Sequence, residues 1–267
     1  MLLLLRRSLA TLSLAVGLLA PVHAEENQTL VLATDFWPPF RIDNGEQAMT
    51  GIDVDLAALL EKRLKLRIKI VRVPWIRALA MMREGKADLM SGLARTPERA
   101  KFILYAEPAY AEIRPAFYGL RDSELRINSY ADLNGPSIGF TRGSAYFEPF
   151  DSDTELKKQS ATDESQLLRM LVGRRFDLIV GSDIQVDYEL KLRAIDDIVF
   201  KHPYRPERTT PLYIGISRQS PFSKRKHELD RAIADLFADG SLQTLLARYG
   251  VSPPAGISAP FSPTKAQ

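Results

Sequence analysis

Apolar residues recur along the chain with two alternating periods, one typical of strands and one typical of helices. Residues 30–34 form a short apolar run, and residues 68–73 alternate between apolar and polar side chains as a half-buried strand does. Between them, residues 53–64 have apolar side chains three or four positions apart, which predicts a helix. A second helix is predicted over residues 75–84 and a third strand over residues 88–93.

The same alternation returns in the second half of the chain. Strands are predicted over residues 137–141 and 177–180, and a helix is predicted over residues 163–174 with Asp163 as its N-cap. Two more helices are predicted near the end, the first of them capped by Ser223. Strands that alternate with helices predict β-α-β units, and two units of about 100 residues each predict an α/β protein with two lobes.

The first 24 residues are predicted to be a cleavable export signal. Arg6 and Arg7 precede an apolar stretch over residues 8–20, and the sequence that ends at Ala24 fits the small-x-small pattern of a cleavage site. The alternative is a membrane anchor, but the uncharged stretch is short and rich in small residues, whereas a spanning helix needs about 20 apolar residues. We therefore expect cleavage after Ala24.

Charge and composition exclude several classes of function. Cleavage would remove two arginines and no acids, so the net charge would fall from +3 to +1, and no nucleic-acid partner is expected. The chain has no cysteine, which excludes disulfides, thiolate metal sites and cysteine nucleophiles. Because His202 and His227 are the only histidines after the signal, we expect no zinc site and predict no cofactor. The tail over residues 252–267 is rich in Pro, Ser and Ala and is expected to be mobile.

Residues just after each strand are the binding candidates, because ligands of open α/β sheets bind beyond the carboxyl ends of the strands. Trp37 and Phe40 flank a double proline after the first strand, and each is either a pocket wall or part of the core. Trp75 begins a helix after the second strand. Arg77, on the same turn, is either a carboxylate ligand or an ordinary surface charge.

The third strand is followed by a helix start with the composition of an anion site. Thr96 is a good N-cap, Pro97 suits the first helical position, and Arg99 lies in the first turn. Free amides at a helix start favour anions, and an arginine there adds a planar two-pronged donor for a carboxylate. A salt bridge within the cap is the alternative role for Arg99, and the local sequence does not decide between the two.

Three segments in order, TDFWPPF, GIDVDLAALLEKRL and PWIRALAMMREGKADLMSGLARTPERAKFILYAEPAY, resemble the periplasmic solute-binding proteins of polar amino-acid ABC uptake systems, known as extracellular solute-binding family 3. The resemblance runs from about Leu30 to Gly250. It implies an α/β, two-lobed periplasmic-binding-protein fold of type II, with two parallel-type sheets flanked by helices and a two-strand hinge. It also implies a location in the periplasm.

The resemblance assigns roles to single residues. Trp37 and Trp75 fall at pocket positions, and Arg99 matches the arginine that grips the ligand α-carboxylate. Ser144 matches the turn of the second lobe that holds the same carboxylate, and Asp183 lies near the acid that binds the α-amino group.

Two positions depart from the family pattern. Ala94 stands where many members have a Ser or Thr hydroxyl, and Ser182, rather than its neighbour Asp183, is in register with the amine-binding acid. These departures suit a larger or non-standard amine or acid.

The leading hypothesis is reversible capture of a small-molecule ligand by lobe closure in a monomer, for delivery to an ABC permease. Residues 25–118 and 209–251 would form lobe 1 and residues 119–208 lobe 2, with hinges near residues 117–119 and 206–210.

Two other functions remain open. A free binder could instead pass its signal to a membrane sensor. Some relatives of the fold resemble cyclohexadienyl dehydratases, and Glu148 and Asp183 are candidates for the general acid that such an enzyme needs. The alternative for Glu148 is a solvated helix charge.

Overall fold

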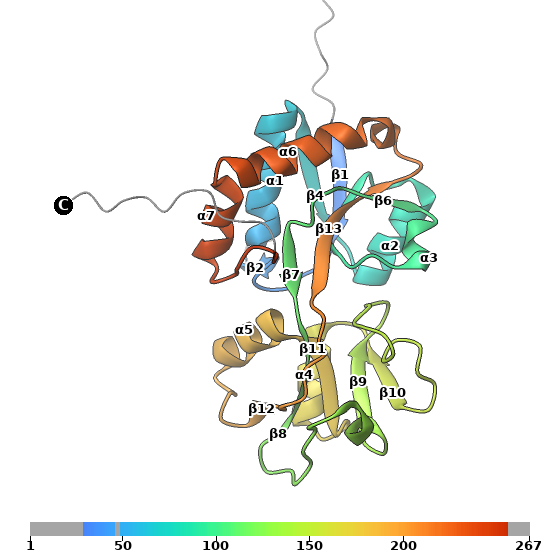
Figure 1. The fold of residues 1–267 in the computed structure, drawn as a ribbon, viewed down its shortest axis with the longest axis vertical. Coiled ribbons are helices and arrows are strands. Elements are labelled where there is room, and N and C mark those ends of the chain that lie inside the picture. The colour runs from blue at the N-terminus through green and yellow to red at the C-terminus, as the bar shows by residue number, and fades with distance from the viewer. Residues whose placement is uncertain (1–28, 46–48, 256–267) are drawn as a thin grey trace, which may run out of the picture.

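The structure is a computed structural model that describes residues 29–45 and 49–255. The predicted signal peptide, residues 1–24, and residues 256–267 of the predicted tail lie outside the described residues. Two α/β lobes, each built on its own sheet, are joined by two chain crossings (Figure 1). Within the described ranges, no helix is long and apolar enough to cross a membrane.

The sheet of lobe 1 combines parallel strands from the N-terminal half with an antiparallel strand from near the C-terminus. In spatial order its strands are β4 (Arg67–Arg72), β1 (Thr29–Thr34), β5 (Leu89–Leu93), β13 (Thr210–Ser217) and β6 (Ile103–Tyr105), and β7 (Ala111–Ile113) also pairs with β13. β1 is parallel to β4 and β5, whereas β13 is antiparallel to β5, β6 and β7. β13 thus returns the chain to lobe 1, since it follows the segments of lobe 2 in the sequence.

Helices cover both faces of this sheet. The helices of lobe 1 are α1 (Ile52–Leu64), α2 (Trp75–Glu84), the short α3 (Pro97–Ala100), α6 (Lys226–Ala238) and α7 (Ser241–Arg248). Because successive strand residues point to opposite faces, Leu30 and Leu32 pack in the core that contains α1, α6 and α7, while Val31 and Ala33 pack in the core that contains α2. A short hairpin of β2 (Ile42–Asp43) and β3 (Met49–Thr50) precedes α1.

The sheet of lobe 2 has the same mixed character. In spatial order its strands are β10 (Lys157–Ala161), β9 (Ser137–Thr141), β11 (Leu178–Ser182), β8 (Pro115–Leu120) and β12 (Val199–Lys201). β9 is parallel to β10 and β11, and β8 is antiparallel to β11 and β12. Its helices are α4 (Glu164–Val172), α5 (Asp183–Arg193) and the 3-10 turn η1 (Tyr130–Leu133).

The predicted strands and helices are present, and one predicted cap is wrong. Asp163 caps α4 by accepting a hydrogen bond from the Gln166 amide at 2.7 Å, as predicted. Ser223 caps no helix, because it lies inside the 3-10 turn η2 (Pro221–Arg225), which leads directly into α6. Ser220 caps η2 instead, because its hydroxyl accepts a hydrogen bond from the Phe222 amide at 3.1 Å, and Pro221 suits the first position of this turn.

The first crossing between the lobes lies earlier than residues 117–119, where the sequence predicted it. β8 pairs along its length with β11, with Phe117 opposite Val180, so residues 115–118 belong to the sheet of lobe 2. The crossing is therefore at Arg114, between β7 and β8. All six residues of β8 are buried, so the segment has no alternating pattern that could have marked it as a strand. The second crossing, residues 202–209, overlaps the predicted hinge at residues 206–210.

Candidate ligand-binding cleft

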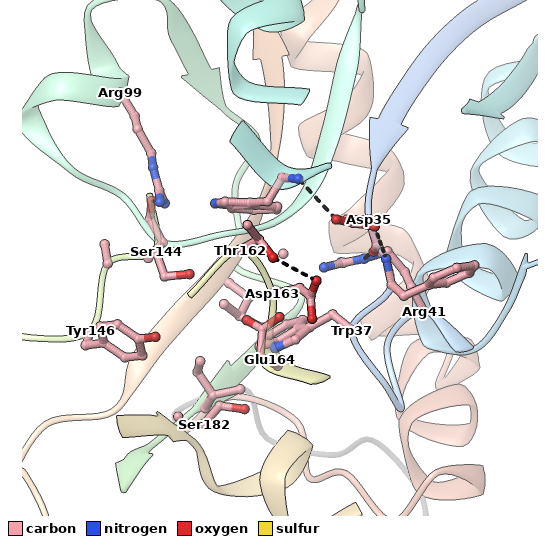
Figure 2. A pocket seen from close by; sticks show the side chains of 18 residues that line it. Asp35, Trp37, Arg41, Arg99, Ser144, Tyr146, Thr162, Asp163, Glu164 and Ser182 are labelled. Carbon is pink, nitrogen blue, oxygen red and sulfur yellow. Dashed lines mark hydrogen bonds between the residues drawn. The ribbon is translucent and has the colours of Figure 1, made fainter. Parts of the chain in front are cut away.

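A cavity lies between the two lobes, where the strands β1, β5, β9, β10 and β11 end (Figure 2). The lining residues from lobe 1 are Asp35, Phe36, Trp37, Arg41, Trp75, Gly92, Ala94, Arg99, Ile113 and Leu212, and those from lobe 2 are Ser144, Ala145, Tyr146, Thr162, Asp163, Glu164, Gly181 and Ser182. Of the six residues predicted to bind ligand, Trp37, Trp75, Arg99 and Ser144 therefore lie together, while Arg77 and Asp183 lie outside the lining.

Arg99 is held in the cleft by the start of α3. The side chain of Thr96 caps α3 by accepting a hydrogen bond from the Arg99 amide at 3.2 Å. The Arg99 guanidinium donates to the carbonyl of Ala94 at 2.9 Å and, across the cleft, to the carbonyl of Gly143 at 2.7 Å. Arg99 is 7% exposed, and burial lowers the pKa of its guanidinium. No carboxylate within the described residues forms an ion pair with it, although Asp151 attracts it from a longer distance.

The turn that contains Gly143 brings lobe 2 against lobe 1. The Gly143 carbonyl also accepts a hydrogen bond from the Trp75 indole nitrogen at 3.1 Å, so two side chains of lobe 1 converge on one carbonyl of lobe 2. Gly143 has φ +77°, and a Cβ there would come within 2.3 Å of Ile76 Cδ1. The positive φ therefore favours glycine, and a Cβ would displace the end of the Ile76 side chain. Ser144, the next residue, lines the cavity.

Trp37 forms a wall of the cavity, and Phe40 lies in the core behind it. The two rings are stacked with centroids 4.6 Å apart, and Phe40 has no exposed surface. The guanidinium of Arg41 lies 5.2 Å from the Trp37 ring centroid. Of the two alternatives stated for each aromatic residue, Trp37 therefore lines the pocket and Phe40 lies in the core.

Arg41 is a second buried arginine in the lining, and sequence reasoning missed it. Its guanidinium forms an ion pair with Asp53, whose carboxylate also accepts hydrogen bonds from Ser91 and Tyr110, both at 2.7 Å. Gly92 has φ +71°, and a Cβ on it would lie 2.8 Å from Arg41 Nη1, so the guanidinium occupies the space above that glycine. Its Nε also donates to the Asp35 carbonyl at 2.7 Å. No sequence signal marks Arg41, because Asp53 lies in α1 and the hydroxyls that complete that carboxylate come from β5 and from the segment after β6.

Three carboxylates line the cavity away from Arg99. Asp35, after β1, accepts from the Arg72 guanidinium at 3.1 Å and from the Trp75 amide at 3.2 Å, which fixes the start of α2. Asp163 and Glu164 lie at the start of α4 in lobe 2. Burial raises the pKa of Glu164 to about 7, with smaller contributions from the charges around it. The sequence named Asp163 only as a cap and did not single out Glu164.

Arg77 and Asp183 point away from the cavity for geometric reasons. Arg77 follows Trp75 by two positions in α2, which places it about 200° around the helix axis, and its side chain is exposed. Asp183 is the first residue of α5, and its carboxylate accepts from the amides of Arg114 at 3.2 Å and Ile184 at 2.8 Å, close to the first crossing. Its neighbour Ser182 lines the cavity instead.

The arrangement can bind a small molecule with an anionic end. The guanidinium of Arg99 and the hydroxyl of Ser144 come from opposite lobes, so an anion that contacts both would connect them. Trp37 and Trp75 offer flat apolar surface to the remainder of such a molecule. Among the residues with described positions, no group of three or more His, Asp or Glu side chains is arranged to hold a metal ion.

Comparison with known sequences gives a consistent group of relatives. A model of the bacterial extracellular solute-binding proteins, family 3, matches residues 30–252. The ABC transporter arginine-binding protein 1 of Escherichia coli is 25% identical over 215 residues, which cover 78% of this chain and 85% of that protein. The L-arginine-binding protein of Pseudomonas aeruginosa is 24% identical over 249 residues, which cover 89% of this chain and 93% of that protein.

Solved structures share the fold. An ancestral arginine-binding protein bound to arginine superposes with a TM-score of 0.74 at 21% identity, covering 83% of this chain and 98% of that one. A histidine kinase sensor domain with similarity to periplasmic binding proteins superposes with a TM-score of 0.77 at 17% identity, covering 85% and 99%. The two-lobed α/β architecture predicted from the sequence is therefore confirmed.

Proposed function

The chain belongs to the bacterial extracellular solute-binding proteins, family 3, and from this premise we propose that it captures a small, carboxylate-bearing, amino-acid-like solute between its lobes. The residues that hold the solute are Trp37, Trp75, Arg99 and Ser144. Arg77 and Asp183, the other two residues predicted from the sequence, are left out of this set because neither lines the cleft.

The observation that carries the proposal is the position of Arg99. A buried guanidinium without an acidic partner is costly, and a ligand carboxylate supplies the missing charge. Two of its N–H groups donate to backbone carbonyls, one in each lobe. The guanidinium therefore lies where the two lobes contact each other. A carboxylate bound there lowers the free energy of the closed state relative to the open one, which is the basis of capture by hinge closure.

A thermal-shift screen over amino acids, polyamines, opines and small carboxylates tests the proposal. A ligand present at 100 times its dissociation constant stabilises the folded protein by about 2.7 kcal/mol. Calorimetry of Arg99→Ala with the best ligand should then give a dissociation constant about ten- to a hundredfold higher, since a charge-assisted hydrogen bond contributes about 1.5–3 kcal/mol.

Arg77→Ala is the matched control, because Arg77 is an exposed arginine on the neighbouring helix. It should change the affinity by less than about twofold, in line with a surface charge. Equal affinity in Arg99→Ala and the wild type would reject the proposed role of Arg99.

We further propose that the protein is exported, is processed after Ala24 and works in the periplasm as a monomer that delivers its solute to an ABC permease. The arginine-binding relative from Escherichia coli is named as part of an ABC transporter, which supports this route. Docking to a membrane sensor is the alternative, supported by the likeness to the sensor domain of a histidine kinase. Neighbouring genes for a permease and an ATPase would favour delivery for uptake.

A dehydratase-like enzyme is a second candidate, because a carboxyl group in the cleft has the pKa that a general acid needs. That group is Glu164, with a pKa of about 7. Asp183 lies outside the lining, and Glu148 lines the adjoining hollow, where it accepts a hydrogen bond from Ser152. Incubation of the purified protein with prephenate and arogenate, followed by absorbance, tests this candidate. Product formation that Glu164→Gln abolishes would establish it.

A further inference from the structure

One carboxylate in the cleft wall has no partner of its own. Glu164 is the first residue of α4 and lines the cavity. Within the described part of the chain, no other residue donates a hydrogen bond to its carboxylate or forms an ion pair with it, and the carboxylate accepts only from its own backbone amide. Figure 2 shows its side chain directed into the cavity, on a different side from Arg99.

The other two acids that line the cavity have ion-pair or hydrogen-bond partners within the protein. Asp35 is neutralised by Arg72 and accepts from the Trp75 amide. Asp163 accepts from the Gln166 amide at 2.7 Å and from the Thr162 hydroxyl at 3.1 Å, so it serves α4 as its cap. Glu164 is thus the acid whose lone pairs remain available to a ligand.

The surroundings of Glu164 favour an added positive charge. The groups that face it are the carboxylates of Asp163 and Asp35, the hydroxyl of Tyr146 and a single cation, Arg41. Arg41 is itself neutralised by Asp53, so its attraction for Glu164 is offset. Burial raises the pKa of Glu164 to about 7, so its own amide and Arg41 compensate its ionised form only in part.

We propose that Glu164 selects a cationic group of the ligand, at a point in the cleft separate from the carboxylate contact at Arg99. The inference rests on the proposed function and adds a residue that determines specificity. The solute carries a cation as well as a carboxylate, and the Glu164 carboxylate binds the cation. Ser182, at the end of β11, supplies no charge for this purpose, and the Asp183 carboxylate faces Arg114.

The test compares probes with and without a cation. L-arginine, L-histidine and 5-aminopentanoate carry both charges, whereas glutarate and pentanoate carry carboxylate alone. Calorimetry at pH 8, where Glu164 is ionised, should show that Glu164→Gln weakens the binding of the first three probes about ten- to a hundredfold. The affinity for glutarate and pentanoate should stay equal or rise.

Asp183→Asn is the matched control, because Asp183 is the acid at the first position of the other long helix of lobe 2 and lies outside the cleft. It should leave every affinity within about twofold. A second readout separates ligand contact from a folding defect: at pH 6.5, binding of a cationic probe to wild type should release a proton, detected as heats that differ between two buffers, and Glu164→Gln should abolish this release.

Each outcome bears on the inference. Unchanged affinity of Glu164→Gln for all cationic probes that bind would overturn it and leave the proposed function in place. Binding of glutarate or pentanoate but of none of the cationic probes would have the same effect. If wild type binds none of the five probes, both the inference and the proposed function are rejected for ligands of this class.

Discussion

Arg41 and Arg99 are both buried arginines of lobe 1 in the cleft wall, but different groups satisfy them. Arg41 is paired with Asp53, and two further donors, from Ser91 and Tyr110, complete that carboxylate. Arg99 has backbone carbonyls for its partners, and one of them belongs to the opposite lobe. The charge of Arg41 is therefore cancelled inside lobe 1, whereas the charge of Arg99 is left for something that enters the cleft.

This difference separates structural from binding roles better than burial does. Arg41 is 2% exposed and Arg99 is 7% exposed, so accessibility hardly distinguishes them. What distinguishes them is whether an opposite charge is supplied from within the same lobe. By this criterion Arg41 stabilises lobe 1 and lines the cavity, and Arg99 is the arginine that we propose to bind the ligand.

The largest expected effect is on stability, in Arg41→Ala. Removal of the guanidinium would leave Asp53 buried without its counter-charge, and the loss of one partner of a buried ion pair costs about 3–5 kcal/mol. Urea denaturation followed by circular dichroism should show this loss in the free energy of unfolding.

Two controls make the comparison sharp. Arg72→Ala removes an arginine that pairs with Asp35 from a position where its side chain is 56% exposed, and it should cost about 1 kcal/mol or less. Arg99→Ala should also cost less than Arg41→Ala, because no buried carboxylate is left behind. Equal losses for Arg41→Ala and Arg99→Ala would break the distinction between the two arginines.

The sequence predicted Arg99 but not Arg41, and the reason is physical. Arg99 lies in a local signature, since the Thr-Pro pair before it specifies a helix start, and the family resemblance then assigned it to the ligand carboxylate. Arg41 follows a double proline with no local signature. Its ion-pair partner in α1, and the hydroxyls in β5 and after β6 that complete that carboxylate, become neighbours only when lobe 1 folds. The same contrast holds for the strands. The parallel strands were predicted because each alternates with a helix along the sequence, whereas the antiparallel strands β8 and β13 pair with segments that are distant in the sequence.

The rest of the site depends on which of two nearby residues points into the cleft, and the sequence does not determine this to a single position. Sequence reasoning put the end of β11 at the cleft but could not decide between Ser182, which lines it, and Asp183, which begins α5 and faces Arg114. The same limit applied to Arg77, two positions along α2 from Trp75. Glu164 had no signal, because a Glu in the first turn of a helix is common and its enclosure depends on closure of the lobes.

The next effect concerns the pH dependence of stability at Glu164. The pKa of this group in the folded protein is about 7, above its usual value of 4.5, so the folded protein binds more protons than the unfolded chain between these values. The free energy of unfolding of wild type should therefore fall by about 1–3 kcal/mol as the pH rises from 4.5 to 7.5, relative to Glu164→Gln. Urea denaturation across this range, without ligand, measures the difference.

The comparison with the variant is needed because another group titrates in the opposite sense. Burial lowers the pKa of His202, the residue that follows β12, to about 4, so stability associated with it is lost as the pH falls below 6.5. His202 is present in both proteins, and its contribution cancels in the difference. Parallel pH profiles for wild type and Glu164→Gln would show that the cleft does not enclose Glu164.

The smallest effect tests the contact between the lobes that Arg99 shares with Trp75. Trp75→Phe keeps an aromatic ring in the wall, removes the donor to the Gly143 carbonyl and leaves a smaller ring beside the Arg99 guanidinium, which lies 5.7 Å from the Trp75 centroid. One neutral hydrogen bond contributes about 0.5–1.5 kcal/mol, so calorimetry with the best ligand of the screen should show affinity reduced by at most about tenfold. Because the Arg99 bond to the same carbonyl remains, small-angle scattering should still detect closure when that ligand is added. A loss of affinity as large as that of Arg99→Ala would contradict the proposed role of Arg99. It would mean that the hydrogen bonds to the Gly143 carbonyl stabilise the closed state more than the contact between Arg99 and the ligand does.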